Sequence, residues 1–181
     1  VGLSFKGSAV YHEARADCLN LALFEFIPWL LGAHASVKEA RAALSRVNLI
    51  PTPFSPQLPS SPLHFLLADK EDCIVLEPMA DGLRIHENPV GVLTNNPPFE
   101  MQLYGLSRYM GLSARQPENR FAPKLPLHTF SRGMGALGLP GDLSSPSRFV
   151  RAAFTKMNSV SGDGEEESVN QFFHILGAAE Q

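Results

Sequence analysis

Apolar and polar positions along the chain follow helical spacing in some segments and strand spacing in others. Residues 22–33 are mostly apolar and predict a buried helix. Ser36 and Glu39 have the spacing of a capping box and predict a second helix over residues 36–46. Residues 1–10 are predicted to form a strand.

The middle of the chain is rich in strand-forming residues. Four segments are predicted to be strands, namely residues 63–68, 73–79, 83–86 and 91–94. The dipeptide Asp81-Gly82 marks a tight hairpin between the second and the third. Asn95 would then stand at the end of the last strand, beside a turn of Asn96-Pro97-Pro98.

Helical spacing returns in the last half of the chain. Three apolar stripes have helical spacing, and the last two are predicted to be buried: Phe99, Leu103, Leu106 and Met110; Val150, Ala153, Phe154 and Met157; Val169, Phe172, Phe173 and Leu176. Ser145 is expected to cap the second of these helices, with Pro146 at its first position, and the last is expected to begin near Asp163. Helices, then strands, then helices predict an α+β fold.

Composition narrows the classes of protein. A chain of 181 residues that is 44% hydrophobic and 18% charged is predicted to form one domain, residues 1–181, with a real core. The net charge is −3 and no basic run occurs, so we expect no nucleic-acid partner. The apolar run 19–33 contains Glu25 and Pro28 and is too short for a membrane span. Two cysteines predict no disulfide framework and favour the cytoplasm.

Glycines concentrate just before a predicted helix. Gly133-Met-Gly135-Ala-Leu-Gly138 fits G-x-G-x-x-G, but a proline precedes it and Leu139–Asp142 separate it from the helix. A dinucleotide site is therefore not expected. Glycines let backbone come close to another group, and the remaining prediction is that this loop forms the rim of an enzyme cleft. Arg148, in the first turn of the helix, opposes the helix dipole, so it is either a surface residue or faces a polarised group in a cleft.

Other catalytic patterns are absent from the sequence. The six histidines do not cluster, His12-Glu13 lacks the second histidine of a zinc protease, and no G-x-S-x-G occurs. We therefore expect no metal and no cofactor. Asn95 by itself is equally well explained as a turn asparagine.

Six blocks of sequence, in order, are similar to one known family. They are Phe24–Leu31, Ser61–Phe65, Asn88–Phe99, Ser131–Arg148, Asn158–Gly162 and Gln171–Leu176. In these blocks the chain resembles the choloylglycine hydrolase family, which includes bile salt hydrolases and penicillin V acylases. The resemblance covers essentially all of the chain, and its longest blocks are more similar to the bile salt hydrolases.

The resemblance implies an N-terminal-nucleophile hydrolase with an αββα sandwich of antiparallel sheets. In this family an N-terminal cysteine attacks an amide and its own α-amino group acts as the base. Val1–Phe5 resembles an interior strand of the family, and Cys18 and Cys73 do not match the nucleophile. We therefore expect an internal fragment, truncated at both ends, that does not turn over substrate by itself.

The resemblance also assigns catalytic residues. Asn95 matches the active-site asparagine that orients the reacting amide, and Arg148 matches an arginine near the nucleophilic sulfur. Ser4 stands where the family often has an asparagine of the oxyanion site. We expect Asn95 and Arg148 to border one cleft.

A proline-rich loop resembles the family segment that walls the substrate pocket. Phe54, Leu58 and Leu63 would face a steroid, unless they are ordinary core residues. Met134 either packs within the glycine loop or lines the same pocket.

The predicted function is hydrolysis of glycine- or taurine-conjugated bile acids. One alternative is a penicillin V acylase-type amide hydrolase. A second is a non-catalytic steroid-binding module, which the Ser4 substitution keeps open. The resemblance also implies a homotetramer for the full-length protein.

Overall fold

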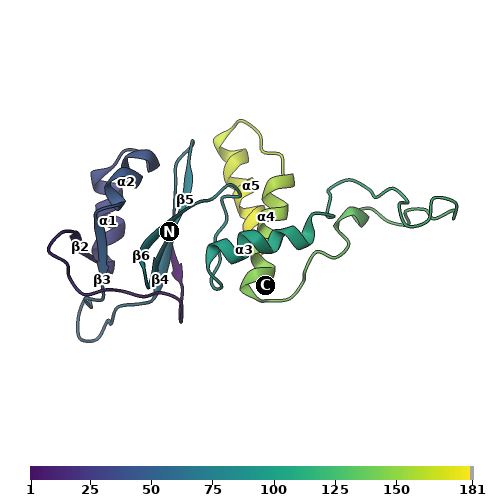
Figure 1. Ribbon diagram of the computed structural model, residues 1–181. Coiled ribbons are helices and arrows are strands. Elements are labelled where there is room, and N and C mark those ends of the chain that lie inside the picture. Colours follow the sequence, from purple (N-terminus) through teal and green to yellow (C-terminus); the bar gives the residue numbers. More distant parts are fainter. Residues whose placement is uncertain (180–181) are drawn as a thin grey trace. The chain divides into compact units, whose positions relative to one another are not determined.

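The structure is a computed structural model that describes residues 1–179, and it comprises two compact units, Val1–Met101 and a second from Gln102 onward (Figure 1). The strands are β1 (Gly2–Ser4), β2 (Leu19–Ala22), β3 (Val47–Ile50), β4 (Leu63–Ala68), β5 (Cys73–Met79) and β6 (Gly82–Glu87). The helices are α1 (Leu23–Ala33), α2 (Val37–Leu44), α3 (Phe99–Gly105), α4 (Ser145–Asn158) and α5 (Glu165–Gly177), with short 3₁₀ helices η1 (Leu106–Tyr109) and η2 (Met134–Ala136).

A four-stranded antiparallel sheet organises the first unit. Its strand order is β1-β4-β5-β6, and Ser4 pairs with Leu63 at the start of β4. The segments 63–68 and 73–79 form the predicted strands, and the turn Asp69–Asp72 joins them. Only residues 2–4 of the predicted first strand are extended in the sheet. Strands β2 and β3 form a separate parallel pair, which the sequence pattern did not predict.

The two faces of this sheet differ in chemistry because successive side chains of a strand point to opposite faces. Phe65, Ile74 and Leu76 belong to a core cluster that α1, α2, β2 and β3 complete (Figure 1). The alternate positions on the other face include His64 and Glu77, which are buried although they are polar. The predicted helices over 22–33 and 36–46 are confirmed as α1 and α2, and the Ser36 hydroxyl caps α2.

The predicted strand over residues 91–94 is wrong, because this segment is irregular. The buried side chain of Asn88 forms hydrogen bonds with backbone N–H and C=O groups that would pair with a neighbouring strand if this segment were extended. Its Oδ1 accepts from the N–H of Gly91 at 2.8 Å, and its Nδ2 donates to the carbonyl oxygen of Val92 at 3.0 Å. An asparagine that bonds nearby backbone in this way competes with regular secondary structure.

The second unit holds helices α4 and α5, which contact each other. Arg151 of α4 joins three backbone carbonyls, those of Pro140, Asp142 and Ala178, at 3.1, 2.7 and 3.0 Å. Helix α4 begins one residue earlier than expected, since Ser144 rather than Ser145 is the capping residue. The loop between η1 and η2 extends away from both helices (Figure 1).

One predicted buried stripe is exposed. Val169, Phe172, Phe173 and Leu176 of α5 are all exposed, with Phe173 at 64%. Helical spacing places these side chains on one face but does not supply a neighbour to cover it. Met110 and Met157, at the ends of the other two stripes, are exposed as well, whereas Val150 and Ala153 are buried as predicted.

Candidate active site

The side chain of Asn95 contacts the end of β1. Its Nδ2 donates a hydrogen bond of 2.9 Å to the carbonyl oxygen of Ser4, although 91 residues separate the two. Two of the residues that the sequence predicted for catalysis are therefore neighbours in the first unit. The contact is between the Asn95 amide and the Ser4 backbone.

A second asparagine attaches the same turn to the same segment. The Nδ2 of Asn96 donates to the hydroxyl of Ser8 at 2.7 Å, and the peptide bond between Asn96 and Pro97 is cis. The turn at residues 95–98 is thus joined to the chain after β1 at two points, and both bonds come from side chains. A polar group held by such bonds on a rigid scaffold is oriented before any ligand arrives.

Leu63 lies next to Ser4, while Phe54 and Leu58 lie on the preceding loop. Leu63 packs against the core cluster and is partly buried. Phe54 and Leu58 are 67% and 58% exposed, and the ring of Phe54 meets that of Phe24 edge to face at 5.2 Å. Phe54 and Leu58 are therefore not core residues, and their role in a substrate pocket stays a prediction.

Tyr11 closes the end of this loop. Its hydroxyl donates to the carbonyl oxygen of Ser61 at 2.9 Å and accepts from the N–H of Leu63 at 2.8 Å. Burial raises the pKa of Tyr11 above 10.0, and the backbone hydrogen bond from Leu63 only partly offsets this. The hydroxyl therefore stays protonated at neutral pH and fixes the start of β4.

A buried carboxylate bonds the residue that follows the turn at 95–98, and the sequence patterns did not point to it. Glu77, 1% exposed, accepts from the Nδ1 of His64 at 3.1 Å and lies 3.3 Å from the Nε2 of His86. Burial raises the pKa of Glu77, but the hydrogen bonds from His64 and the N–H of Phe99, together with the nearby ring of His86, outweigh burial and lower it to about 2. The sequence did contain a pattern that could have indicated this group, because His64, Glu77 and His86 each follow an apolar residue in three consecutive strands.

This group is not arranged as a metal site. Within residues 1–179, no three His, Cys, Asp or Glu side chains are grouped so that they could hold a metal ion.

Arg148 and Met134 belong to the second unit. Arg148 is half-buried in the first turn of α4, and its N–H donates to the carbonyl oxygen of Ser144 at 2.9 Å. The Sδ of Met134 accepts from the N–H of Phe130 at 3.3 Å, so Met134 packs within its own loop. Whether Arg148 borders the same cleft as Asn95 stays a prediction.

The glycine loop before α4 is shaped by contact with its own chain. Gly135 accepts a 2.9 Å hydrogen bond from the N–H of Ser113, and a Cβ at Gly135 would overlap the carbonyl oxygens of Ser113 and Arg115. Backbone does approach closely at Gly135, but the group approached is residues 113–115 of the same chain, and the position of this loop at the rim of a cleft stays a prediction. Gly133 and Gly138 have φ of 80° and 95°, a region that favours glycine.

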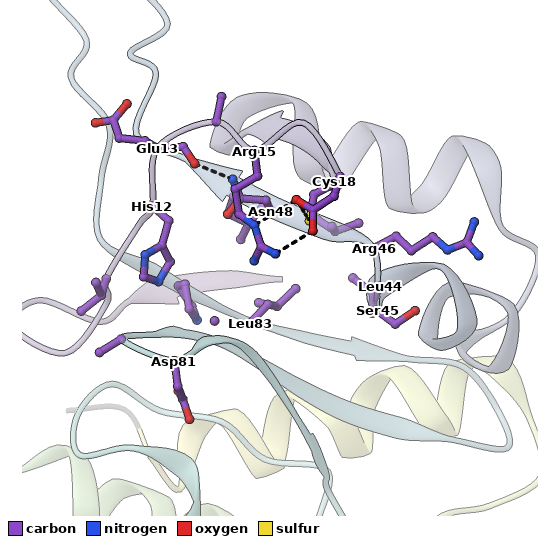
Figure 2. Close-up of a pocket in the computed structure, with 18 of the residues that line it drawn as sticks. His12, Glu13, Arg15, Cys18, Leu44, Ser45, Arg46, Asn48, Asp81 and Leu83 are labelled. Atoms are coloured by element: carbon purple, nitrogen blue, oxygen red, sulfur yellow. Dashed lines mark hydrogen bonds and ion pairs between the residues drawn. The ribbon is translucent and has the colours of Figure 1, made fainter.

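The first unit also contains a hollow of about 770 Å³, which Figure 2 shows. It is lined by residues from 10–18, 44–49 and 78–85, and by none of the seven residues predicted for the site. Two of its charged residues, Arg15 and Asp17, form an ion pair of 2.9 Å beside Cys18. The Nδ2 of Asn48 donates to the carbonyl oxygen of Glu13 at 2.9 Å.

Comparison with known proteins defines the class. A family model of linear amide C–N hydrolases matches residues 1–181. That model describes the choloylglycine hydrolase family, and the chain belongs to this family.

Two bacterial proteins are among the relatives of the chain. The chain is 57% identical over 180 residues to the bile salt hydrolase/transferase of Lactiplantibacillus plantarum, covering 99% of this chain and 56% of that protein. It is 33% identical to the conjugated bile acid hydrolase of Lactobacillus acidophilus, covering 97% of this chain and 56% of that one. The chain thus spans about half the length of the curated relatives it matches.

Solved structures agree with the fold. A variant of conjugated bile acid hydrolase from Clostridium perfringens superposes with a TM-score of 0.87 at 33% identity, over 98% of this chain and 55% of that one. Penicillin V acylase from Agrobacterium tumefaciens has a TM-score of 0.71 at 20% identity, over 94% and 46% of the two chains. The predicted α+β fold of this hydrolase family is confirmed. Among residues 1–179, no helix has the length and apolar character needed to cross a bilayer.

Proposed function

We propose that the protein containing this chain hydrolyses conjugated bile acids, cleaving the amide bond between the steroid acyl group and glycine or taurine. The contact between Asn95 and Ser4 carries the proposal, because it places an oriented amide donor at the end of β1. The relative at 57% identity is named a bile salt hydrolase/transferase, which supports this choice of substrate.

The reaction assigns a distinct role to each group. A cysteine thiolate, which these 181 residues do not supply at a matching position, attacks the amide carbon and forms a tetrahedral intermediate. The amide of Asn95, oriented by the Ser4 carbonyl, stabilises the oxygen on which negative charge develops. One donor of this kind is worth roughly 3 kcal/mol in the transition state. The amine then leaves, and water hydrolyses the acyl-enzyme.

Arg148 is proposed to act on the nucleophile. A guanidinium close to a thiol stabilises the thiolate, which is the attacking form. Its position in the first turn of α4 is otherwise unfavourable for a cation.

A chimera tests the function directly. In it, residues 1–181 replace the matching segment of the Lactiplantibacillus plantarum relative, so that the rest of the domain is present. The chimera is expected to release glycine from a glycine-conjugated bile acid, and Asn95→Ala is expected to reduce kcat/KM by about 100-fold. The 181-residue chain alone is expected to release none. A folded chimera with no turnover would contradict the proposal.

Ser4 provides a specific observation for the alternative of a non-catalytic steroid-binding module. The Ser4 side chain is exposed and shorter than the asparagine that the family often has there. If the side chain at this position supplies an oxyanion donor, Ser4→Asn in the chimera should raise kcat. A chimera that binds conjugates without hydrolysis, both with Ser4 and with Ser4→Asn, would favour the binding module.

The penicillin V acylase alternative has weaker support. The structural match to that enzyme is at 20% identity and indicates the shared fold. Parallel rates on a bile acid conjugate and on a phenoxyacetyl amide distinguish the two, and we expect the bile acid conjugate to be preferred.

Two further properties belong to the same proposal. Cys18 and Cys73 are both thiols, which supports a cytoplasmic location. A homotetramer is proposed for the whole protein, and sedimentation of the chimera tests it.

A further inference from the structure

The buried group formed by His64, Glu77 and His86 connects the two chain segments that meet at the candidate site. His64 lies on β4, Glu77 on β5 and His86 on β6, so the group crosses three adjacent strands. All three side chains are at least nine-tenths buried. A carboxylate buried this deeply is costly unless hydrogen bonds satisfy it.

One connection leads from Glu77 to the turn that carries Asn95. The Oε1 of Glu77 accepts a hydrogen bond of 2.9 Å from the N–H of Phe99, the first residue of α3. Phe99 is 1% exposed and follows Asn95 by four residues. The turn at residues 95–98 is thus fixed at its far end by a side chain from the centre of the sheet.

The other connection leads from Glu77 to the segment that carries Ser4. The ring of His64, hydrogen-bonded to Glu77, stacks on the ring of Phe5 at a centroid distance of 4.3 Å and an angle of 7°. Phe5 is fully buried and directly follows Ser4. The same carboxylate is therefore linked to both partners of the hydrogen bond between Asn95 and Ser4, directly to the chain after Asn95 and indirectly, through His64 and Phe5, to the chain after Ser4.

We infer that Glu77 is a positioning residue, which holds the amide of Asn95 against the carbonyl oxygen of Ser4. It does so through the Phe99 N–H on one side and through His64 and Phe5 on the other. Glu77 does not touch the substrate in this scheme. The expected effect of Glu77 on turnover rests on the proposed function, whereas its effect on the order of the Asn95 side chain does not.

The charge of Glu77 is central to the inference. Two hydrogen bonds converge on it, from the Nδ1 of His64 and the backbone N–H of Phe99, and the Nε2 of His86 lies 3.3 Å from its second oxygen. Hydrogen bonds to a charged acceptor are roughly twice as strong as neutral ones. The Nδ1 of His86 also lies 3.5 Å from the carboxylate of Glu100. If position 77 carried a neutral amide, Glu100 would be the stronger partner of His86.

NMR of the 181-residue chain tests this without any activity. The readout is exchange with water of the Asn95 side-chain amide protons. Glu77→Gln, which keeps the shape and removes the charge, is expected to speed this exchange about tenfold. Glu77→Asp, which keeps the charge, is expected to restore part of the protection. The matched control is Glu87→Gln on β6, whose exposed carboxylate pairs with Arg41, and it should leave Asn95 unchanged.

Two outcomes would overturn the inference. In one, Asn95 exchange is the same in Glu77→Gln as in the parent chain. In the other, the backbone amides of β4 and β5 lose protection to the same extent as Asn95, which is the result of a purely structural role. If Glu77→Gln does not fold, Glu77→Asp alone decides, because its shorter side chain must still loosen Asn95 measurably.

The chimera separates this inference from the proposed function. There, Glu77→Gln is expected to lower kcat about tenfold with little change in KM, since orientation of a donor acts mainly on the transition state. An inactive parent chimera would overturn the proposed function and leave the NMR result to decide on Glu77.

Discussion

Single residues explain most of what positions the candidate site. The amide of Asn95 donates to a backbone carbonyl, Asn88 orders the segment before it, and Glu77 fixes Phe99, four residues after it. Each is a polar side chain that bonds backbone far away in the sequence or across a tight turn. Such bonds are specific because a buried polar group without a partner is costly.

Glu77 should make stability depend on pH in the acid range. Its pKa is about 2 in the folded chain against an ordinary value of 4.5, so the unfolded chain binds the proton more readily. The carboxylate therefore stabilises the fold fully above pH 4.5, by about 3 kcal/mol, and this contribution is lost as the pH falls towards 2. Urea unfolding from pH 7 to pH 3 should show a smaller loss for Glu77→Gln than for the parent chain.

The control for this prediction is Glu87→Gln, because the Glu87 side chain is exposed. Its stability should fall with pH in parallel with the parent chain. Parallel curves for Glu77→Gln as well would show that Glu77 is not the group that titrates.

Gly135 should be intolerant of a side chain. In Gly135→Ala the new Cβ would overlap two carbonyl oxygens of residues 113–115, and neither is the end of a flexible side chain. We expect a cost of about 1–3 kcal/mol and faster hydrogen exchange at the Ser113 amide, which donates to Gly135. Gly141→Ala is the matched control, since nothing lies within 4 Å of a Cβ there. Equal exchange at Ser113 in both variants would contradict the prediction.

At the scale of elements, periodicity located helices and strands better than it predicted their burial. The strands over 63–68 and 73–79 and the helices over 22–33 and 36–46 were predictable because apolar spacing and turn chemistry agree there. The parallel pairing of β2 with β3 was not, because pairing partners distant in sequence leave no local signal. The irregular segment 91–94 depends on a single asparagine contact.

Helices α4 and α5 should respond differently to the same substitution. Phe149 of α4 is fully buried, so Phe149→Ala should cost about 3–5 kcal/mol of the free energy of unfolding. Phe172 of α5 is 58% exposed, so Phe172→Ala should change it by about 0.5 kcal/mol or less. Denaturant unfolding of the 181-residue chain measures both. A large cost for Phe172→Ala would mean that the apolar face of α5 is covered in solution.

At the scale of the whole molecule, the resemblance supplied the site that patterns alone could not. Asn95 is an ordinary turn asparagine by its neighbours, and only the family motif distinguishes it. The structure then brings Ser4 into contact with Asn95, and the pairing of β1 with β4 sets Leu63 opposite Ser4. The His64–Glu77–His86 group belongs to no motif, so it became visible only once the strands were paired.

Asn95 and Arg148 should act as one catalytic unit in the complete domain. A double-mutant cycle in the chimera, with Asn95→Ala and Arg148→Ala, tests this through kcat/KM for glycine release. Because groups that serve one transition state are not additive, we expect a coupling energy of about 1 kcal/mol or more. Asn95→Ala combined with Arg46→Ala is the control and should be additive. Additivity for both pairs would contradict a shared cleft.

The clamp that Tyr11 places on Ser61 and Leu63 has a consequence for how such an enzyme could diversify. Because these bonds fix the start of β4, we expect substitutions at loop positions such as Phe54 and Leu58 to leave the sheet unchanged. The loop side chains that would contact a steroid could then change during evolution, while the contact between Asn95 and Ser4 stays the same. We therefore expect substitutions in the proline-rich loop to change which conjugate is preferred without changing the rate of the chemical step.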